Sequence, residues 1–567
     1  MKGANRTMIT IQGKGVSTGI GMGPLYFYRR NKAEIKNYTV TDTAAEWLRF
    51  KGAQSIAVDQ LGVLAEKARE EAGDEAAMLF ETHQMMAEDL DYEEAIQDLI
   101  ENEAYNAEWA VSEVASQFHD MFASMDDEYM RGRAADVKDV SGRILNILCG
   151  VVQGGIDSDV PVLLASDDLA PSETIQLDKS KILGFITSFG SSSSHTAILA
   201  RTMGIPAIVG LGDQLDPIYE GRMVVVDGGT GAVIVDPTDD VLTDFVAKRE
   251  EQLQQRALLE TLKGQENVTL DGKKIRVYCN IGSPEDVDAV KMNDGGGIGL
   301  FRSEFLYLNS ATYPTEDEQF EAYKAVLQGM GDKEVIIRTC DIGADKQIDY
   351  FELPKEENPA MGMRALRISL SRPGFFRTQL RALYRASAYG NLGIMFPMVT
   401  SVWEVRETKR LIESVKKELT EEGKPFSDHV EIGVMIETPA AAVISDRLAK
   451  EVDFFSCGTN DLTQYTLACD RQNNDLGRFY DPHHLSVIRL LKMVVDNAHK
   501  NGVWVGICGE LGADLEMTET FLAIGVDELS VTPRAVLSIR NAIRNIDTTV
   551  TTPPILAAIE GDETPKY

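Results

Sequence analysis

Eight short apolar runs alternate with amphipathic stretches in the second half of the chain, and this alternation constrains the fold more than any other feature. The runs lie at residues 275–281, 297–301, 335–339, 393–398, 432–436, 454–457, 504–508 and 528–531. Strands alternating with helices indicate a parallel sheet, and eight such units predict a closed (β/α)8 barrel. Functional side chains are then expected just beyond the carboxyl ends of the strands, because barrel enzymes carry their chemistry on that rim.

The composition and the spacing of apolar residues change twice in the first half of the chain. Residues 44–148 show apolar side chains at three- and four-residue spacing, which predicts helices, whereas the flanks at 9–25 and 161–236 contain glycines and short β-branched runs. We therefore predict an α/β multidomain protein with a helical domain inserted into a small α/β domain. The expected boundaries are 1–28 with 150–237 for the α/β domain, 29–149 for the helical domain, 238–265 for a linker helix and 266–567 for the barrel.

Charge and composition exclude several classes of function. The 567 residues carry 56 Lys and Arg against 89 Asp and Glu, a formal charge of −33, which repels nucleic acid and anionic lipid at long range. We find no apolar run long enough to span a bilayer, and no hydrophobic segment follows Lys2 and Arg6 as a secretory signal requires. The six cysteines are scattered without close pairs, which favours reduced thiols in the cytoplasm.

A run of serines precedes His195 at the start of an expected helix, within residues 190–201. Backbone N–H groups at a helix N-terminus and small hydroxyl residues favour a phosphate, and a neutral imidazole is a competent nucleophile near pH 7. His195 is therefore a candidate phosphate acceptor. The alternative is that Ser194 only caps a helix and His195 is an ordinary first-turn residue.

Polar residues gather at the expected strand ends. Glu437 and Asp461 offer two oxygen ligands that suit Mg²⁺ or Mn²⁺, although the same carboxylates could be neutralised by arginines instead. Four arginines could converge on this rim and bind a small polyanion through bidentate hydrogen bonds, whereas each alone would be an ordinary surface ion pair. The four are Arg302, Arg338, Arg364 and Arg471.

Cys508 ends the seventh run between two glycines, within Gly-Ile-Cys-Gly-Glu. The glycines would allow a ligand to approach the backbone and would leave the thiol accessible as a proton donor to an enolate carbon. A buried structural cysteine fits the same position equally well.

Taken together, the motifs resemble those of one family. They lie at residues 168–174, 194–201, 204–210, 299–306, 338–346, 358–364, 433–439, 454–465 and 506–510. Over essentially the whole chain, their order is similar to that in Enzyme I of the bacterial phosphoenolpyruvate:sugar phosphotransferase system. Single motifs are shared with pyruvate phosphate dikinase and phosphoenolpyruvate synthase, but the order and total length fit Enzyme I best.

The resemblance implies roles for particular residues. His195 would be phosphorylated on Nε2, Cys508 would protonate the enolate of pyruvate, and Glu437 and Asp461 would hold Mg²⁺. Thr174 matches a residue that contacts the active histidine. The residues implied to bind or lie near phosphoenolpyruvate are Arg302, Arg338, Lys346, Arg364, Asn460, Asp461 and Arg471.

The resemblance also implies partners. The helical domain would dock a histidine-containing phosphocarrier protein through a surface that includes Met85, Met86 and Arg133, although Met86 also continues an apolar stripe that fits a helical core. A homodimer through the barrel is implied, with no nucleic acid and no membrane insertion. One departure is Ser191, which stands where the family usually has glycine, so the loop there would be strained or follow another path if that glycine has a positive φ.

Three other functions remain open from the sequence. A Mg²⁺-dependent lyase or aldolase acting on a pyruvate enolate would use the same barrel residues but would leave the His195 segment without a purpose. A dikinase or synthase would need a nucleotide-binding domain, for which we find no glycine-rich phosphate loop. A non-catalytic phosphoprotein would not need Glu437, Asp461, Arg471 and Cys508.

Overall fold

The computed structural model divides the chain into two compact units, Met1–Gln255 and Arg256–Tyr567. It describes residues 7–28, 35–72, 74–124, 128–151, 156, 158–167, 169, 173, 177–190, 194, 196–197, 200–201, 204–308, 310, 312–343 and 348–561. The four-part division expected from the sequence is finer than these two units and stays a prediction. In the described part of the chain, every helix is either too short or too polar to cross a lipid bilayer.

The first unit contains an eight-stranded sheet in the order β1-β8-β7-β3-β4-β5-β6-β2. Its strands are β1 (Ile9–Gln12), β2 (Lys14–Ser17), β3 (Ile20–Phe27), β4 (Val162–Ser166), β5 (Ile182–Thr187), β6 (Ala207–Val209), β7 (Met223–Asp227) and β8 (Ala232–Val235). β3 and β4 pair in parallel although the whole helical block separates them in sequence. The expected insertion of the helical domain into the α/β domain is therefore confirmed.

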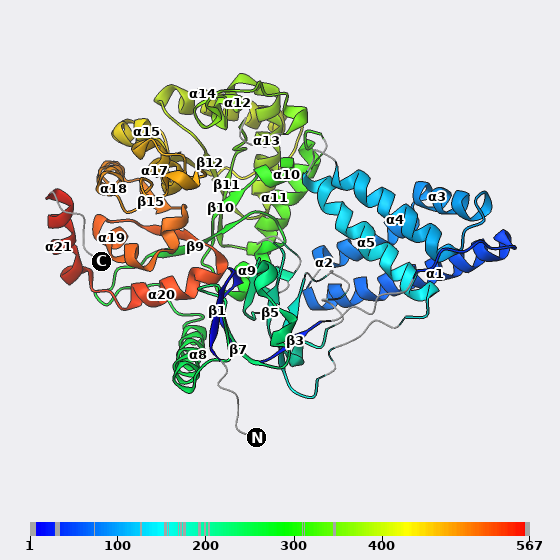
Figure 1. The fold of residues 1–567 in the computed structure, drawn as a ribbon. Helices are drawn as coiled ribbons and strands as arrows, with labels where there is room; N and C mark the ends of the chain where they lie inside the picture. The colour runs from blue at the N-terminus through cyan, green and yellow to red at the C-terminus, as the bar shows by residue number, and fades with distance from the viewer. Residues whose placement is uncertain are drawn as a thin grey trace. The chain divides into compact units, whose positions relative to one another are not determined.

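Five helices form the inserted block: α1 (Thr43–Ala72), α2 (Asp74–Ala87), α3 (Leu90–Glu101), α4 (Ala107–Ala123) and α5 (Glu128–Leu148) (Figure 1). They bury one apolar cluster of their own, which includes Phe50, Leu61, Ile96, Val111 and Ile144. Because the stripe of each helix faces this shared core, the three- and four-residue spacing in the sequence is explained. The cluster is separate from the cores of the sheet.

The second unit is a closed barrel in which eight parallel strands pair in sequence order and β9 joins β16. The strands are β9 (Arg276–Ile281), β10 (Ile298–Arg302), β11 (Glu334–Arg338), β12 (Asn391–Phe396), β13 (Glu431–Ile436), β14 (Phe454–Cys457), β15 (Trp504–Ile507) and β16 (Glu528–Val531). Each of the eight runs identified in the sequence forms one strand. The (β/α)8 fold is therefore confirmed.

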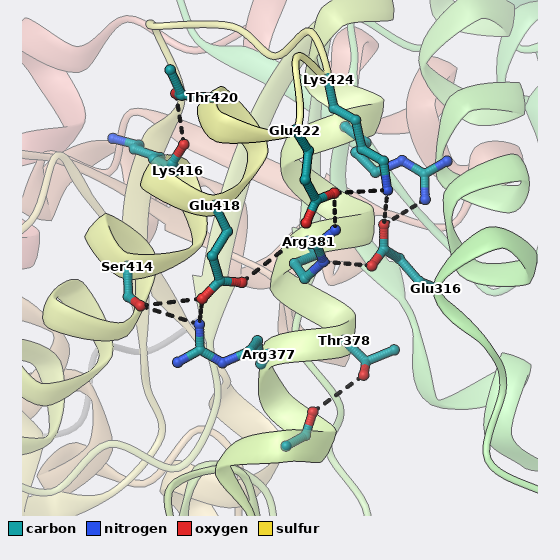
Figure 2. Close-up of polar contacts among 12 residues, drawn as sticks. Glu316, Arg377, Thr378, Arg381, Ser414, Lys416, Glu418, Thr420, Glu422 and Lys424 are labelled. Atoms are coloured by element: carbon teal, nitrogen blue, oxygen red, sulfur yellow. Dashed lines mark hydrogen bonds and ion pairs between the residues drawn. The ribbon is translucent and has the colours of Figure 1, made fainter.

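Helices surround the barrel (Figure 1). They are α9 (Asp286–Met292), α10 (Glu304–Leu308), α11 (Glu316–Met330), α12 (Leu366–Ser371), α13 (Pro373–Ala386), α14 (Val402–Glu421), α15 (Pro439–Val443), α16 (Ser445–Leu448), α17 (Thr459–Leu467), α18 (Leu485–His499), α19 (Leu515–Ile524), α20 (Val536–Arg544) and α21 (Thr548–Glu560). Between them and the strands lies the largest apolar core, while a smaller cluster that includes Leu300, Met395 and Phe454 fills the barrel interior. An ion-pair network around Arg381 ties α11, α13 and α14 together on the outer surface (Figure 2).

The expected linker helix is α8 (Asp239–Glu260). Val241, Leu242 and Phe245 in its first turns pack against the sheet of the first unit. No residue of α8 is buried, so the rest of the helix has little to hold it except its own backbone hydrogen bonds. It ends four residues before Gly264, which adopts a positive φ of 76° and closes the predicted helical stretch.

Candidate active site

A cavity of about 600 Å³ opens at the carboxyl ends of the barrel strands. Eight residues that the sequence singled out line it: Arg302, Arg338, Arg364, Glu437, Asn460, Asp461, Arg471 and Cys508. The fold explains the gathering, because Arg302 and Arg338 end β10 and β11, while Glu437 and Cys508 directly follow β13 and β15. Parallel strands of a barrel end on one rim, so residues far apart in sequence meet there.

Two of the arginines form an inner, buried pair. Arg338 binds the carboxylates of Glu304 and Asp341, the latter through Nη1 at 2.9 Å, and Arg364 binds Asp341 through Nη2 at 3.1 Å. Burial alone would lower the pKa of Arg338, but these carboxylates outweigh it and raise that pKa above its ordinary value. The inner guanidinium groups therefore stay charged at every pH the fold tolerates.

The other two arginines lie on the outer part of the cavity. Arg302 is exposed, and the side chain of Arg471 is 37% exposed, with its Nε 3.9 Å from Oδ1 of Asp461. The main-chain N–H of Arg471 donates to Oε1 of Gln464 at 3.1 Å, which fixes the start of the loop after α17. These two side chains are less constrained than the inner pair and have room to turn toward a ligand.

Glu437 is completely buried at the floor of the cavity. Its Oε1 accepts a hydrogen bond from the main-chain N–H of Met398 at 2.5 Å, while Oε2 has no hydrogen-bond partner within the described part of the chain. Burial, followed by the negative charges of Asp461 and Asp341, raises the pKa of Glu437 to about 8. An oxygen left unpaired in such a place suits a cation, which would replace the proton.

The charges that line the cavity support the same conclusion. Its described lining holds four arginines against the six carboxylates of Glu304, Asp341, Glu437, Asp461, Asp470 and Glu510. Such a lining does not attract an anion by itself, because the carboxylates outnumber the arginines. A divalent cation held by Glu437 and Asp461 would add two positive charges and offset the excess of carboxylates, and oxygen donors are the ligands that Mg²⁺ and Mn²⁺ prefer.

Cys508 lies on the cavity wall but is only 4% exposed. Burial raises the pKa of its thiol to about 12, so the sulfur keeps its proton at neutral pH. Packing requires glycine at both neighbouring positions, because a Cβ on Gly506 would lie 2.0 Å from Oε2 of Glu528 and one on Gly509 would lie 2.0 Å from Oγ1 of Thr459. Gly509 also lines the cavity. The thiol expected to be accessible is therefore largely buried, although Cys508 lines the cavity.

Asn460 lies next to Asp461 in the first turn of α17, which begins at Thr459. Its Nδ2 donates to Oε1 of Glu510 at 3.1 Å, and its Oδ1 accepts from the main-chain N–H of Glu510 at the same distance. The hydroxyl of Tyr480 donates to the carbonyl of Asn460 at 3.3 Å. These contacts join the loops after β14 and β15 and hold the Asn460 side chain beside the cavity.

Sequence reasoning did not single out Glu304 or the main chain of Met398. Glu304 lies in the quoted motif at 299–306, but nothing in that motif shows that its carboxylate turns back to Arg338, which is 34 positions away. Asp341 lies in the quoted motif at 338–346, but its bridge between two arginines depends on a long loop. The one signal in the sequence is that each acidic residue closely follows a strand-end arginine, Glu304 after Arg302 and Asp341 after Arg338.

Three predicted residues, His195, Thr174 and Lys346, lie outside the described residues, as does Ser191. Beside them, Gly190 adopts a φ of 115°, and the hydroxyl of Ser194 accepts a hydrogen bond from the main-chain N–H of Ala197 at 3.4 Å. This contact fits an N-cap at Ser194. The roles of Ser194 and His195 stay predictions.

The expected docking surface on the helical block is partly exposed. Met85 is 73% exposed, Met86 packs against the helical core, and Arg133 lies 3.7 Å from Asp136. Met86 also lines a small apolar cavity with Tyr92 and other residues of three helices. Met85 is therefore exposed and Met86 is partly buried. The role of both residues in docking stays a prediction.

Comparison with known proteins adds an independent line of argument. Three domain families match the chain in order: the N-terminal domain of PEP-utilising enzymes over residues 12–133, their mobile domain over 159–231 and their PEP-binding domain over 256–548. The chain is 44% identical over 537 residues to the phosphoenolpyruvate-protein phosphotransferase of Priestia megaterium, covering 94% of both chains. It is 43% identical over 541 residues to the protein of that name from Lactococcus lactis subsp. lactis, covering 95% of this chain and 94% of the relative. With all three domains and such relatives along nearly its whole length, the protein belongs to the family of PEP-utilising enzymes.

Proposed function

We propose that this protein is a phosphoenolpyruvate-protein phosphotransferase that transfers the phosphoryl group of phosphoenolpyruvate to His195. A histidine-containing phosphocarrier protein then accepts the group, in the first step of sugar uptake, and pyruvate is released. The observation that carries the proposal is the convergence of four arginines, two metal-compatible carboxylates and a protonated thiol on one cavity. The names of the relatives favour this activity over that of a lyase, an aldolase or a dikinase.

Phosphoenolpyruvate would bind to both the inner and the outer pair of arginines. Mg²⁺, or Mn²⁺ in its place, would be held by Glu437 and Asp461 and would supply positive charge next to the substrate's oxygens. Arg338 and Arg364 present fixed guanidinium groups from below, while Arg302 and Arg471 can close from the rim. Asn460 and Lys346 complete the set that we assign to substrate binding. Phosphoryl transfer needs chiefly positioning and charge neutralisation, which these residues provide.

The chemical step balances without another reactant. A bond forms between Nε2 of His195 and phosphorus as the bond from phosphorus to the enol oxygen breaks, and that oxygen keeps the electron pair. The resulting enolate takes a proton at its methylene carbon from Sγ of Cys508. A thiol with a pKa near 12 holds its proton until a strongly basic carbon is present, which suits a donor that must not ionise early.

Delivery requires His195 to meet two different surfaces, because its segment belongs to the small α/β domain and not to the barrel. The turns of α8 after Phe245 have no buried side chains, which favours a swivel of the two domains about this helix. We assign docking of the phosphocarrier protein to the helical block, with Met85, Met86 and Arg133. Thr174 is assigned a contact with His195. A homodimer through the barrel and a cytoplasmic location complete the proposal.

Labelled phosphoenolpyruvate tests the proposal directly. With Mg²⁺, the wild-type protein should acquire one acid-labile phosphate and release pyruvate, and addition of a phosphocarrier protein should discharge the label. The variant His195→Ala should acquire none. His119→Ala is a matched control on an exposed pair with Asp120, 2.9 Å away, and should label normally. Label on the His195→Ala protein would refute the assignment.

A further inference from the structure

A single carboxylate, that of Asp341, holds both inner arginines. Its Oδ2 lies 2.9 Å from Nη1 of Arg338, and its Oδ1 lies 3.1 Å from Nη2 of Arg364. All three side chains are more than nine-tenths buried, so little water screens the contacts. Since two guanidinium groups repel one another when desolvated, the carboxylate between them both offsets the repulsion and sets their separation.

The loop that carries Arg364 returns to the end of β11 at this point. Gly343 and Arg364 form an isolated antiparallel bridge, and the main-chain N–H of Ala365 donates to the carbonyl of Ile342 at 2.8 Å. Ala365 has a φ of 52°, which is unfavourable for alanine. Asp341 therefore joins the two ends of one loop by an ion pair on top of these main-chain contacts.

The inner arginines keep hydrogen-bonding capacity after these contacts are made. Within the described residues, Nε of Arg338 and Nε of Arg364 have no hydrogen-bond partner although both are buried. Arg364 is steadied on its other side by the hydroxyl of Tyr465, 3.3 Å from Nη1. Buried N–H groups without partners cost free energy, and an anionic ligand would satisfy them.

We propose that Asp341 is a positioning residue that fixes Arg338 and Arg364 at a set spacing, so that they receive two anionic groups of one small ligand. The inference rests on the proposed function, in which that ligand carries a carboxylate and a phosphate. Guanidinium groups held in place before binding lose little freedom when the ligand arrives, which strengthens binding in the ground state and the transition state alike. Glu304 differs from Asp341 because, of the two arginines, it contacts only Arg338.

The test is the variant Asp341→Asn, which keeps the shape of the side chain and removes its charge. We expect the KM for phosphoenolpyruvate to rise at least 10-fold with a kcat that falls less than threefold, because uniform binding is lost. Arg364→Lys should raise the KM as well. The KM of the double variant should rise by less than the product of the two single increases, because part of the effect of Asp341 passes through Arg364.

A matched control separates positioning from stability. Asp294 binds buried Arg540 at 2.5 Å elsewhere on the barrel, so Asp294→Asn also leaves an arginine without its carboxylate. It should lower the Tm at least as much as Asp341→Asn and change the KM less than twofold. Should Asp341→Asn fail to fold, Asp341→Glu keeps the charge but moves it by one methylene, and a KM raised about fivefold at unchanged Tm is expected.

The outcomes distinguish this inference from the proposed function. If wild-type protein takes no label from phosphoenolpyruvate, the proposed function fails. If wild-type labels normally but folded Asp341→Asn or Asp341→Glu has the wild-type KM, only the positioning role fails. If the KM of the double variant rises by the full product of the two single increases, the positioning role also fails, because Asp341 and Arg364 would then act independently.

Discussion

Met398 holds Glu437 through its main chain, not its side chain: its N–H donates to Oε1 of Glu437 at 2.5 Å. β12 ends at Phe396, and Met398 then adopts a φ of 55°. This conformation turns the N–H toward the cavity floor. Because residues branched at Cβ tolerate a positive φ poorly, the position restricts which side chains can stand there.

Two substitutions of similar volume test this restriction. Met398→Leu should lower the free energy of unfolding by less than about 1.5 kcal/mol, since it conserves the side-chain volume at a buried site. Met398→Ile should cost about 1 to 3 kcal/mol more, because the branched Cβ opposes the positive φ. Chemical denaturation of both variants measures the difference. Equal stabilities would show that the conformation at Met398 carries no such strain.

Glu528 predicts a pH dependence of stability. Its carboxyl lies inside the barrel next to Gly299 and Gly506, and Oε1 has no hydrogen-bond partner within the described residues. Burial and then the charge of Glu334 raise its pKa well above the ordinary value, opposed by Arg276. The folded state thus keeps a proton that the unfolded chain releases above about pH 4.

The sign follows from that difference. The contribution of Glu528 to stability is fully present below the unfolded pKa and is lost as pH rises toward the folded one. Glu528→Gln keeps the shape without an ionisable group, so it should be more stable than wild type at pH 8 and show a smaller difference at pH 5. Thermal melts at both values measure this. A difference independent of pH would contradict it.

The sequence predicted the barrel well because its strands are short apolar runs buried on both faces, and the first polar residue after each run marks the rim. Arg302 and Glu437 were found in this way, whereas Cys508 was found as the last residue of its run. Contacts that depend on chain reversal carry no local signal. The bridge from Asp341 to Arg364 spans a long loop, and the turn at Met398 falls inside a run that looked like strand to its end.

The network on the barrel's outer surface should contribute to stability without affecting catalysis. Arg381, which is 12% exposed, contacts Glu316 of α11 at 2.5 Å, Glu418 of α14 at 3.2 Å and Glu422, just beyond α14, at 2.7 Å (Figure 2). Arg381→Met would leave these carboxylates close together without their shared cation. We expect the free energy of unfolding to fall by about 1 to 3 kcal/mol at pH 7 with an unchanged KM, because a partly buried member of a network matters more than an exposed pair.

Acid should remove the effect of Arg381→Met. The pKa of Glu316 is lowered by Arg381 and Arg385 against the opposing effect of burial, so the stability it provides is present above its unfolded pKa and lost as pH falls through the folded one. Wild type and variant should converge near pH 2 to 3. Arg410→Met is the control, since Arg410 is 75% exposed and pairs only with Glu407 among the contacts described. A comparable loss in that control would show that the network has no special role.

Metal binding should depend on Glu437 and strengthen as pH rises. Since the pKa of Glu437 is raised to about 8, the metal-free protein holds a proton there at neutral pH, and a cation must displace it. Mg²⁺ or Mn²⁺ should therefore raise the Tm more at pH 8 than at pH 6, and chelation should reverse the gain and abolish phosphorylation. Glu437→Gln should lose most of the metal-dependent gain at both pH values. The control is Glu431→Gln. Glu431 lies at the opposite end of β13, where its carboxylate accepts a hydrogen bond from the indole N–H of Trp504 at 3.1 Å. This variant should respond to metal as the wild type does. An undiminished metal response in folded Glu437→Gln would place the cation elsewhere.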